Sequence, residues 1–390
     1  MKKNLVFLSI IFLHCSILKP WLRLPATLSP AFKKKVSAQS VSAVRILIQK
    51  FSDLQSVEIT SLKGFTVKTN LDRYPQPTLK ITFKNNALYL NNKKQVGDRI
   101  FIIPKNGLFS LQSSAYQGSL EIKVNNGEAL LINHISLEDY IYSVLKTESW
   151  PGWPLEVNKV LAVACRTYAV RMILEAQSVK RLYDMTNNNT HQTYSGHHTT
   201  DILKQAVTQT KGIIISDGNE PILAMFDSCC GNILPSKTTH FDFSKAQYLA
   251  RNYKCSYCKK YPIYSWQAEF PLTEFLQKVC PDWQNRRIAK VFLKKDNAGI
   301  VKEVILKSGN QKKLIDGSIF YATFKEIKSY CFDVYKKNNM VRIKGRGYGH
   351  HIGLCQWGAC EMIKRGFNYK RVLLFYYPKT VLTSIEQNSF

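Results

Sequence analysis

The sequence predicts an α+β fold with an antiparallel β-rich N-terminal part, a central core led by a long helix, and a C-terminal Gly-rich turn followed by helices. In residues 41–134, short runs alternate apolar and polar side chains and stop at Gly, Asn or Pro, which is typical of antiparallel strands. After Pro154 the apolar residues recur at helical spacing instead. We therefore expect four segments: a signal peptide or anchor (1–20), a basic tether (21–40), the β-rich region (41–134) and the core (135–385).

Eight short runs carry the strand prediction of the N-terminal region. Their sequences are VRILIQ, VEITSL, FTVKT, LKITF, ALYLNN, RIFIIP, SLEIKV and ALLINH. Asn125-Asn126-Gly127 separates the last two runs, and an Asn-Gly pair strongly favours a tight hairpin turn. This region contains no motif for chemistry, so we interpret it as a scaffold.

A long helix is predicted from Pro154 to about Gln177. Pro154 suits the first helical turn, where its missing N–H costs nothing. The apolar positions at helical spacing are Val157, Leu161, Ala164, Tyr168 and Met172.

Glu148 stands just before this helix, at a corner rich in Trp, Pro and Gly. Trp150 and Trp153 flank the corner, and apolar neighbours raise the pKa of a carboxyl group so that it can serve as an acid. A solvated or helix-capping role is the alternative interpretation of this residue.

The remaining chain mixes helices and strands. We expect a helix over Thr199–Thr210, a strand, Gly turn and returning strand in GIIISDGNEPILAMFD, a tight corner at Ser228–Gly231, and a helix over Leu272–Val279. The strands VFLKK and VKEVILK follow. A further helix begins near Gln356, Gly366 is its expected C-cap, and a last helix runs through Phe375.

Charge and the N-terminus narrow the class of partner. The net charge of +28 predicts a polyanionic partner such as nucleic acid, anionic lipid or an acidic polymer. Lys2 and Lys3 precede an apolar run from Leu5 to Leu18, which is the layout of a secretory leader, cleaved or retained as an anchor. Export to the periplasm or cell envelope is therefore expected, and it argues against a nucleic-acid partner.

The chain has ten cysteines, which fits an oxidising compartment. Without Cys15 of the leader nine remain, and Cys165 is best explained as a small residue in the core. Cys229, Cys230, Cys255 and Cys258 lie on corners that could converge, where either disulfides or a structural zinc ion would explain them. The sequence cannot give a pairing.

Four motifs in fixed order carry a resemblance to a known family. They are Leu137-Glu138-Asp139-Tyr140 with Glu148, Trp153-Pro154 and the run Glu156–Val170; Gln192-x-Tyr194-x-Gly196; the corner Ser228–Gly231; and Gly345-Arg346-Gly347-Tyr348-Gly349-His350-His351-Ile352-Gly353-Leu354-Cys355-Gln356-Trp357-Gly358-Ala359, followed by Gly366 and Tyr376-Tyr377. Over roughly residues 115–380 the chain resembles the stage II sporulation protein D and amidase-enhancer family of bacterial envelope proteins.

This resemblance implies action on peptidoglycan glycan strands, either as a lytic transglycosylase or as a partner that stimulates a cell-wall amidase. The family's catalytic acid falls on Glu148, which would protonate the glycosidic oxygen and then deprotonate the C6 hydroxyl of the sugar. No cofactor is required for that chemistry. A two-carboxylate glycosidase needs a second acid, for which Glu138 and Asp139 are candidates, although both also fit helix N-terminal or solvated roles.

The resemblance also assigns binding residues. The expected substrate-binding residues are Gln192, Tyr194, Gly347, Gly349, His350 and Gln356. Some relatives hold a metal near the Gln-x-Tyr motif with Cys and His ligands, but the loop here has only His191 and no Cys. The candidate metal ligands are therefore His191, Cys229, Cys230, Cys255 and Cys258. Cys355 stands where many relatives have Ser and is not expected to be a required nucleophile, and Arg166 is expected to be a structural ion-pair partner.

Overall fold

The structure is a computed structural model. The expected leader and tether, residues 1–40, lie outside the described residues. Within the described part of the chain, no helix is both long and apolar enough to cross a membrane. The structure describes residues 41–67, 73–188, 191–218, 220–283, 288 and 290–385.

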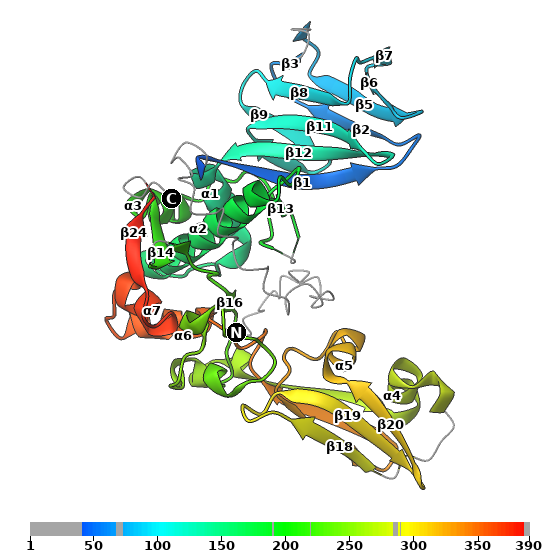
Figure 1. The fold of residues 1–390 in the computed structure, drawn as a ribbon, viewed down its shortest axis with the longest axis vertical. Helices are drawn as coiled ribbons and strands as arrows, with labels where there is room; N and C mark the ends of the chain where they lie inside the picture. Colours follow the sequence, from blue (N-terminus) through cyan, green and yellow to red (C-terminus); the bar gives the residue numbers. More distant parts are fainter. Residues whose placement is uncertain are drawn as a thin grey trace, which may run out of the picture.

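The N-terminal region is built from two antiparallel sheets. Their strands are β1 (Ala43–Phe51), β2 (Ser56–Thr60), β3 (Phe65–Val67), β4 (Arg73–Tyr74), β5 (Thr78–Lys84), β6 (Ala87–Leu90), β7 (Lys93–Lys94), β8 (Arg99–Pro104), β9 (Leu108–Leu111), β10 (Ser114–Gln117), β11 (Ser119–Asn125) and β12 (Glu128–Ser136), with β13 (Met185–Thr186) added from the core. One sheet has the order β13-β1-β12-β11-β8-β3-β4 and the other the order β10-β9-β2-β5-β6-β7 (Figure 1). The expected β-rich N-terminal part is confirmed.

The alternation read from the sequence sets which face of each strand is buried. In β5, Leu79, Ile81 and Phe83 are buried, while Lys80 and Lys84, which point to the opposite face, are exposed. The predicted hairpin is also confirmed. β11 pairs with β12 from Asn125 opposite Glu128, and Asn126 and Gly127 both have positive φ (49° and 75°), as a tight hairpin turn of this kind requires.

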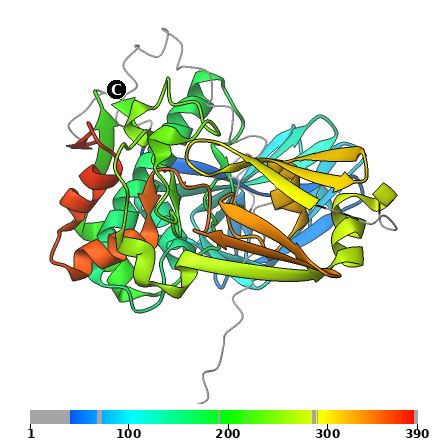
Figure 2. The same cartoon turned by 90° about the horizontal axis from the view of Figure 1, so that it is seen from below.

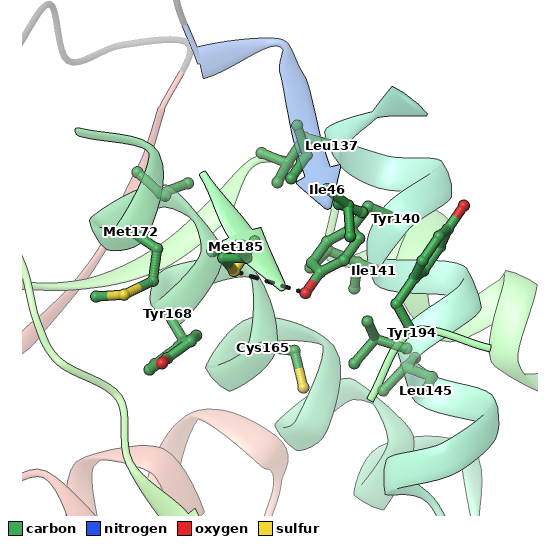
Figure 3. Packing of buried hydrophobic residues seen from close by; sticks show 14 of the residues in the cluster. Ile46, Leu137, Tyr140, Ile141, Leu145, Cys165, Tyr168, Met172, Met185 and Tyr194 are labelled. Carbon is green, nitrogen blue, oxygen red and sulfur yellow. Dashed lines mark hydrogen bonds between the residues drawn. The ribbon is translucent and has the colours of Figure 1, made fainter. Parts of the chain in front are cut away.

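Helix α2 (Leu155–Ser178) is the centre of the core. It contacts α1 (Leu137–Glu148), α3 (Asp201–Gln209), α6 (Gln356–Lys364), α7 (Tyr369–Tyr376) and β14 (Ile213–Asp217). Nearly every residue from Val157 to Ala176 is buried, which explains why its apolar residues are not confined to one stripe. The helix begins one residue after Pro154, which occupies the N-cap position. Figure 3 shows Cys165 of α2 beside Tyr140, Ile141 and Leu145 of α1.

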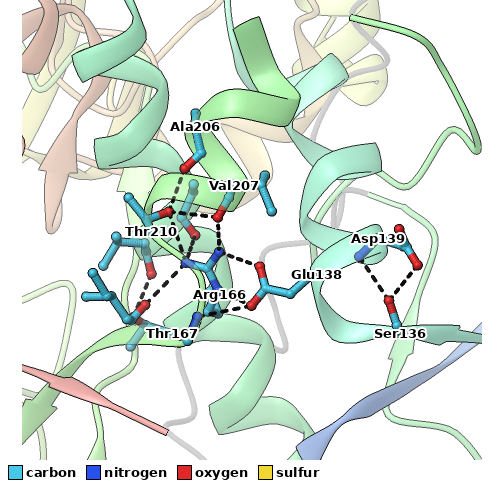
Figure 4. Close-up of polar contacts among 12 residues, drawn as sticks. Ser136, Glu138, Asp139, Arg166, Thr167, Ala206, Val207 and Thr210 are labelled. Atoms are coloured by element: carbon cyan, nitrogen blue, oxygen red, sulfur yellow. Dashed lines mark hydrogen bonds and ion pairs between the residues drawn. The ribbon is translucent and has the colours of Figure 1, made fainter. Parts of the chain in front are cut away.

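Arg166 of α2 forms the expected structural ion pair. Its guanidinium is fully buried and donates to both carboxylate oxygens of Glu138 at 2.9 and 2.6 Å (Figure 4). It also donates to the main-chain oxygens of Val207 and Ile213. The pair therefore joins α1 and α2 to the end of α3 and to the start of β14.

Two small sheets complete the helical core. β15 (Glu220–Pro221), β14 and β24 (Val381–Ser384) form one sheet, in which β14 pairs antiparallel with both neighbours. β16 (Phe226–Asp227) and β23 (Leu354–Cys355) form a parallel pair, with Asp227 opposite Cys355. This small pair brings together two segments that lie far apart in the sequence.

Residues 265–346 form a lobe with a hydrophobic core of its own. Its elements are β17 (Ser265–Pro271), α4 (Leu272–Val279), β18 (Lys290–Lys295), β19 (Val301–Ser308), β20 (Gln311–Asp316), α5 (Gly317–Thr323), β21 (Phe332–Lys337) and β22 (Met340–Arg346). They make two sheets, β17-β22-β21 and β18-β19-β20. Helix α4 has the predicted bounds. Figures 1 and 2 together show the lobe and the N-terminal sheets projecting from the same side of the helical core.

Candidate active site

A cavity of about 240 Å³ lies where the helical core meets this lobe. Glu148 at the end of α1 forms part of its wall, and Tyr321 and Tyr330 contribute from the lobe. The Tyr321 and Tyr330 rings stack with their centroids 4.4 Å apart. The other lining residues are Tyr168, His191, Gln192, Thr193, Ala224, Met225, Phe226, Asp227, Ser228, Tyr348, Gly349, His350 and Gln356.

Glu148 is held at both its main chain and its carboxyl group. Its main-chain oxygen accepts a hydrogen bond from Nε2 of Gln356 at 3.0 Å, and its Oε1 accepts from the N–H of Thr193 at 3.4 Å. Removal of the carboxyl from water raises its pKa to about 7, and the long bond from Thr193 offsets this only in part. None of the ion pairs found among the described residues involves Glu148, so no neighbouring cation stabilises its charged form.

The two tryptophans of the corner that follows Glu148 pack against Trp357 of α6. Trp150 and Trp153 each lie with their ring centroid 5.4 Å from that of Trp357, in edge-on contact. None of these three rings is among the residues that line the cavity. The corner is therefore anchored on α6, which also carries Gln356.

The two side chains of the Gln-x-Tyr motif lie in different places. Gln192 lines the cavity but is buried, and its Oε1 accepts a hydrogen bond from Tyr140 at 3.1 Å. Tyr194, which we expected to bind substrate, is not among the lining residues and lies in the core. Its hydroxyl donates to Oδ1 of Asn133 at 2.6 Å. The two side chains of the motif therefore bond their loop to the N-terminal sheet, through Asn133, and to α1, through Tyr140.

The loop's histidine lies on the wall of the cavity. Nδ1 of His191 lies 3.1 Å from the Tyr168 hydroxyl, and burial lowers the pKa of this histidine to about 4. Around it, within the part of the chain that the structure describes, no three His, Cys, Asp or Glu side chains converge. The residues present therefore do not fit the metal that some relatives hold near this motif.

The Gly-rich turn places some of its residues on the cavity and others behind it. Gly349 and His350 line the cavity, whereas Gly347 does not. His350 donates from Nε2 to the Phe226 oxygen at 2.9 Å and accepts at Nδ1 from the N–H of Ile352 at 3.1 Å. Burial lowers its pKa to about 4, so the ring is neutral, and both nitrogens are already engaged by main chain.

A second carboxyl group, Asp227, lines the cavity and was missed by the sequence analysis. Its Oδ2 accepts the main-chain N–H of His351 at 2.8 Å, and its Oδ1 is buried without a hydrogen-bond partner. Burial raises its pKa well above the ordinary range. A Cβ at Gly349 would come within 2.4 Å of the Cβ of Asp227, so glycine is needed for this close approach. No local sequence pattern around Phe226-Asp227 indicates that this aspartate would line a cavity.

The two carboxylates proposed from the sequence as alternatives lie outside this wall. Glu138 is paired with Arg166, and Asp139 accepts from the N-cap residue Ser136 while its N–H donates back to Oγ of Ser136 at 3.2 Å (Figure 4). Both therefore have the structural roles weighed as the simpler interpretation.

The cysteines form a compact group. The nine that the structure describes are all unpaired, so the disulfide alternative is not formed among them. The sulfur atoms of Cys230, Cys255, Cys258 and Cys355 lie within 4.8 Å of one another. Two of the proposed metal ligands, Cys229 and His191, are outside this group, and Cys355, which was not proposed, belongs to it.

These features define an α+β protein with a carboxyl-bearing, aromatic-lined cavity between a helical core and a β-rich lobe. The family model of the stage II sporulation protein SpoIID matches residues 125–216, which include α1, the corner and α2. An uncharacterised protein of Brachyspira hyodysenteriae is 30% identical over 276 residues, covering 69% of this chain and 72% of that protein.

The relatives with descriptive names include two proteins of Bacillus subtilis. The stage II sporulation protein D of Bacillus subtilis is 24% identical, over 65% of this chain and 76% of its own length. The amidase enhancer of Bacillus subtilis is 22% identical, over 79% of this chain and 50% of its own length. The chain belongs to the stage II sporulation protein D family.

Proposed function

We propose that this protein is a lytic transglycosylase of the cell envelope that cleaves peptidoglycan glycan strands, with Glu148 as both general acid and general base. The observation that carries the proposal is the position of Glu148 on the wall of an aromatic-lined cavity, where burial raises the pKa of its carboxyl group to about 7. A group with this pKa is partly protonated near neutral pH, so it can give a proton in one step and take one in the next.

In the proposed reaction, protonated Glu148 donates its proton to the glycosidic oxygen. The bond between that oxygen and the anomeric carbon breaks, and the leaving sugar departs with a new hydroxyl group. The C6 hydroxyl of the remaining sugar then attacks the anomeric carbon. The Glu148 carboxylate removes the proton of that hydroxyl, which closes an anhydro ring and restores the acid. No water is consumed, and no second carboxylate is needed.

The walls of the cavity support a sugar ligand. Tyr168, Phe226 and Tyr348 present aromatic surface from the core, and Tyr321 and Tyr330 present it from the lobe. Aromatic rings offer apolar faces on which sugar rings can pack. The net charge of +28 would draw the protein toward an acidic polymer such as the cell wall.

Because Asp227 also lines the cavity, the chemical structure of the product must distinguish two possible reactions. With two carboxyl groups on one cavity, a hydrolase that activates water is the competing chemistry. Hydrolysis places solvent oxygen on the new reducing end, whereas the transglycosylase reaction forms an anhydro ring from oxygen already in the sugar.

The test uses purified protein and glycan strands from which the peptides have been removed, incubated in water enriched in heavy oxygen. Mass spectrometry should find anhydro-muramyl ends without the label, and Glu148→Gln should release none. Labelled reducing ends would replace our mechanism with hydrolysis, and normal cleavage by Glu148→Gln would remove this residue from its role.

A second candidate function rests on the relative named amidase enhancer. In that case the protein would bind glycan strands and stimulate a cell-wall amidase without cleaving them. Strand binding without products, together with amidase stimulation that Glu148→Gln leaves unchanged, would favour this function.

A further inference from the structure

We propose that Cys230, Cys255, Cys258 and Cys355 form a structural site for one tetrahedral zinc ion. The inference is independent of the proposed glycan chemistry, because it concerns how the walls of the cavity are held together. It replaces Cys229 and His191 of the sequence-based candidates by Cys355.

The spacing of the sulfur atoms fits a single ion. A zinc ion with four thiolate ligands at about 2.3 Å separates the sulfurs by about 3.8 Å. The Cys230 and Cys258 sulfurs lie 3.8 Å apart, and all four sulfurs lie within 4.8 Å of one another. Such distances exceed a disulfide bond of about 2.05 Å. All four cysteines are buried, so the site is closed as structural zinc sites are.

The surrounding groups are those that accompany metal-bound thiolates. The N–H groups of Cys230 and Gly358 each point to the Cys355 sulfur at 3.3 Å. The Tyr376 hydroxyl lies 3.1 Å from the Cys255 sulfur. Donors of this kind orient the ligands and disperse their negative charge.

The absence of a side chain at Gly358 leaves room for the cysteine sulfurs. A Cβ at this position would lie 2.2 Å from the Tyr376 hydroxyl, 2.8 Å from the Cys255 sulfur and 3.2 Å from the Cys355 sulfur. Gly358 lies inside α6, where glycine is unfavourable on its own, so its presence has a packing cause.

A buried cation lies next to this region. Arg251 is almost fully buried, and its Nε and Nη2 have no hydrogen-bond partner. Its guanidinium lies 5.7 Å from the ring of Tyr376, whose hydroxyl contacts Cys255. Four thiolates around one Zn²⁺ carry a net charge of −2, which would help to compensate this arginine.

The ligands come from three segments that build the cavity. Cys230 follows β16, which carries Asp227, while Cys355 ends β23 and immediately precedes Gln356. Cys258 lies in the 3₁₀ turn Tyr257–Lys260, which packs on α6, and Cys255 lies two residues before this turn. An ion bound here would fix the β16–β23 pair and the start of α6, and so the hydrogen bond from Gln356 to Glu148.

The test measures metal in the full-length protein, expressed with zinc and purified without a metal-affinity tag. Elemental analysis should give one zinc per chain. Cys258→Ser should lose most of it, whereas Cys360→Ser, a change of another buried cysteine on α6, should keep it. Cys229→Ser should also keep it.

Cobalt substitution provides a readout that does not depend on a folded variant. Unaltered protein with Co²⁺ in place of zinc should show the ligand-field bands of a tetrahedral tetrathiolate site. Mass spectrometry after thiol labelling should find these four cysteines protected until a chelator is added. A metal-free protein with disulfides among the four would overturn the proposal, as would iron in place of zinc or zinc retained by Cys258→Ser.

Discussion

The side-chain amide of Gln356 donates a hydrogen bond to the main-chain oxygen of Glu148, 208 positions away in the sequence. Gln356 is the first residue of α6, and Glu148 is the last residue of α1. A main-chain oxygen at a helix C-terminus has no partner within the helix, and Gln356 supplies one. The C-terminal motif therefore positions Glu148 through the backbone of that residue.

Glu148→Gln should lower glycan cleavage by at least about 10²–10⁴-fold, because a general acid contributes about that much and the same group also serves as base. Binding of intact strands should change little, since the amide has the same shape. Product release by mass spectrometry and strand binding by sedimentation check the two effects separately. Loss of binding together with cleavage would contradict this separation.

The raised pKa of Glu148 should also appear in stability. The folded protein disfavours ionised Glu148, so stability is lost as pH rises from the ordinary pKa near 4.5 to about 7. The loss is at most about 3 kcal/mol. Glu148→Gln removes it, so the variant should unfold at higher denaturant than the parent at pH 8. The two should converge near pH 4, and a difference that does not vary with pH would argue against this explanation.

Cleavage should decrease on the alkaline side with an apparent pKa near 7. Glu148 must be protonated to start the reaction, and desolvation sets its pKa at about 7. Above that value kcat/KM should fall about tenfold for each pH step of one. Initial rates across a pH series measure this limb. An activity that rises steadily through pH 9 would exclude Glu148 as the acid.

Gln356→Met should weaken both catalysis and local stability. The substitution keeps the volume but leaves the Glu148 oxygen without its donor, at a cost of about 1–3 kcal/mol. We expect kcat to fall about tenfold or more because the acid is displaced. Gln267→Met on the exposed lobe strand β17 is the control and should be neutral. An equal effect of both substitutions on kcat would mean that Gln356 has no positioning role.

Breaking the buried pair between Arg166 and Glu138 should be the most destabilising of these changes. Arg166→Met leaves Glu138 without its cation, and removal of one partner of a buried pair typically costs about 3–5 kcal/mol. The Arg166→Met/Glu138→Leu double variant should recover part of that loss. Urea unfolding is measured for the parent, for Arg166→Met and Glu138→Leu singly, and for the double variant. A double variant as unstable as the sum of the two singles would show that the two residues do not interact.

Much of this structure could be predicted from local sequence. Helix α4 and the turn at Asn126-Gly127 depend on neighbours within a few residues. Glu148 is indicated by its corner and by the family resemblance, while its partners Thr193 and Gln356 lie far away in the sequence. Asp227 could not be found this way, because its position is set by pairing with β23 and by space at Gly349. Tyr194 is the opposite case, a residue that the sequence placed at the site and the structure places in the core. Its motif suggested contact with a ligand, but the side chain lies in the core, bonded to Asn133. Cys355 likewise lies beside Cys230, Cys255 and Cys258 only because the fold brings distant segments together.

The lobe of residues 265–346 begins and ends at one place. Ser265 lies opposite Arg346 in the β17–β22 pair, and the N–H of Gly347 donates to the oxygen of Tyr264 at 2.7 Å. An insertion whose two ends meet can change in length or sequence without disturbing the register of the rest. Tyr321 and Tyr330 of this lobe form one wall of the cavity. The side chains that this lobe presents to the cavity can therefore change while Glu148 and the residues that hold it stay the same.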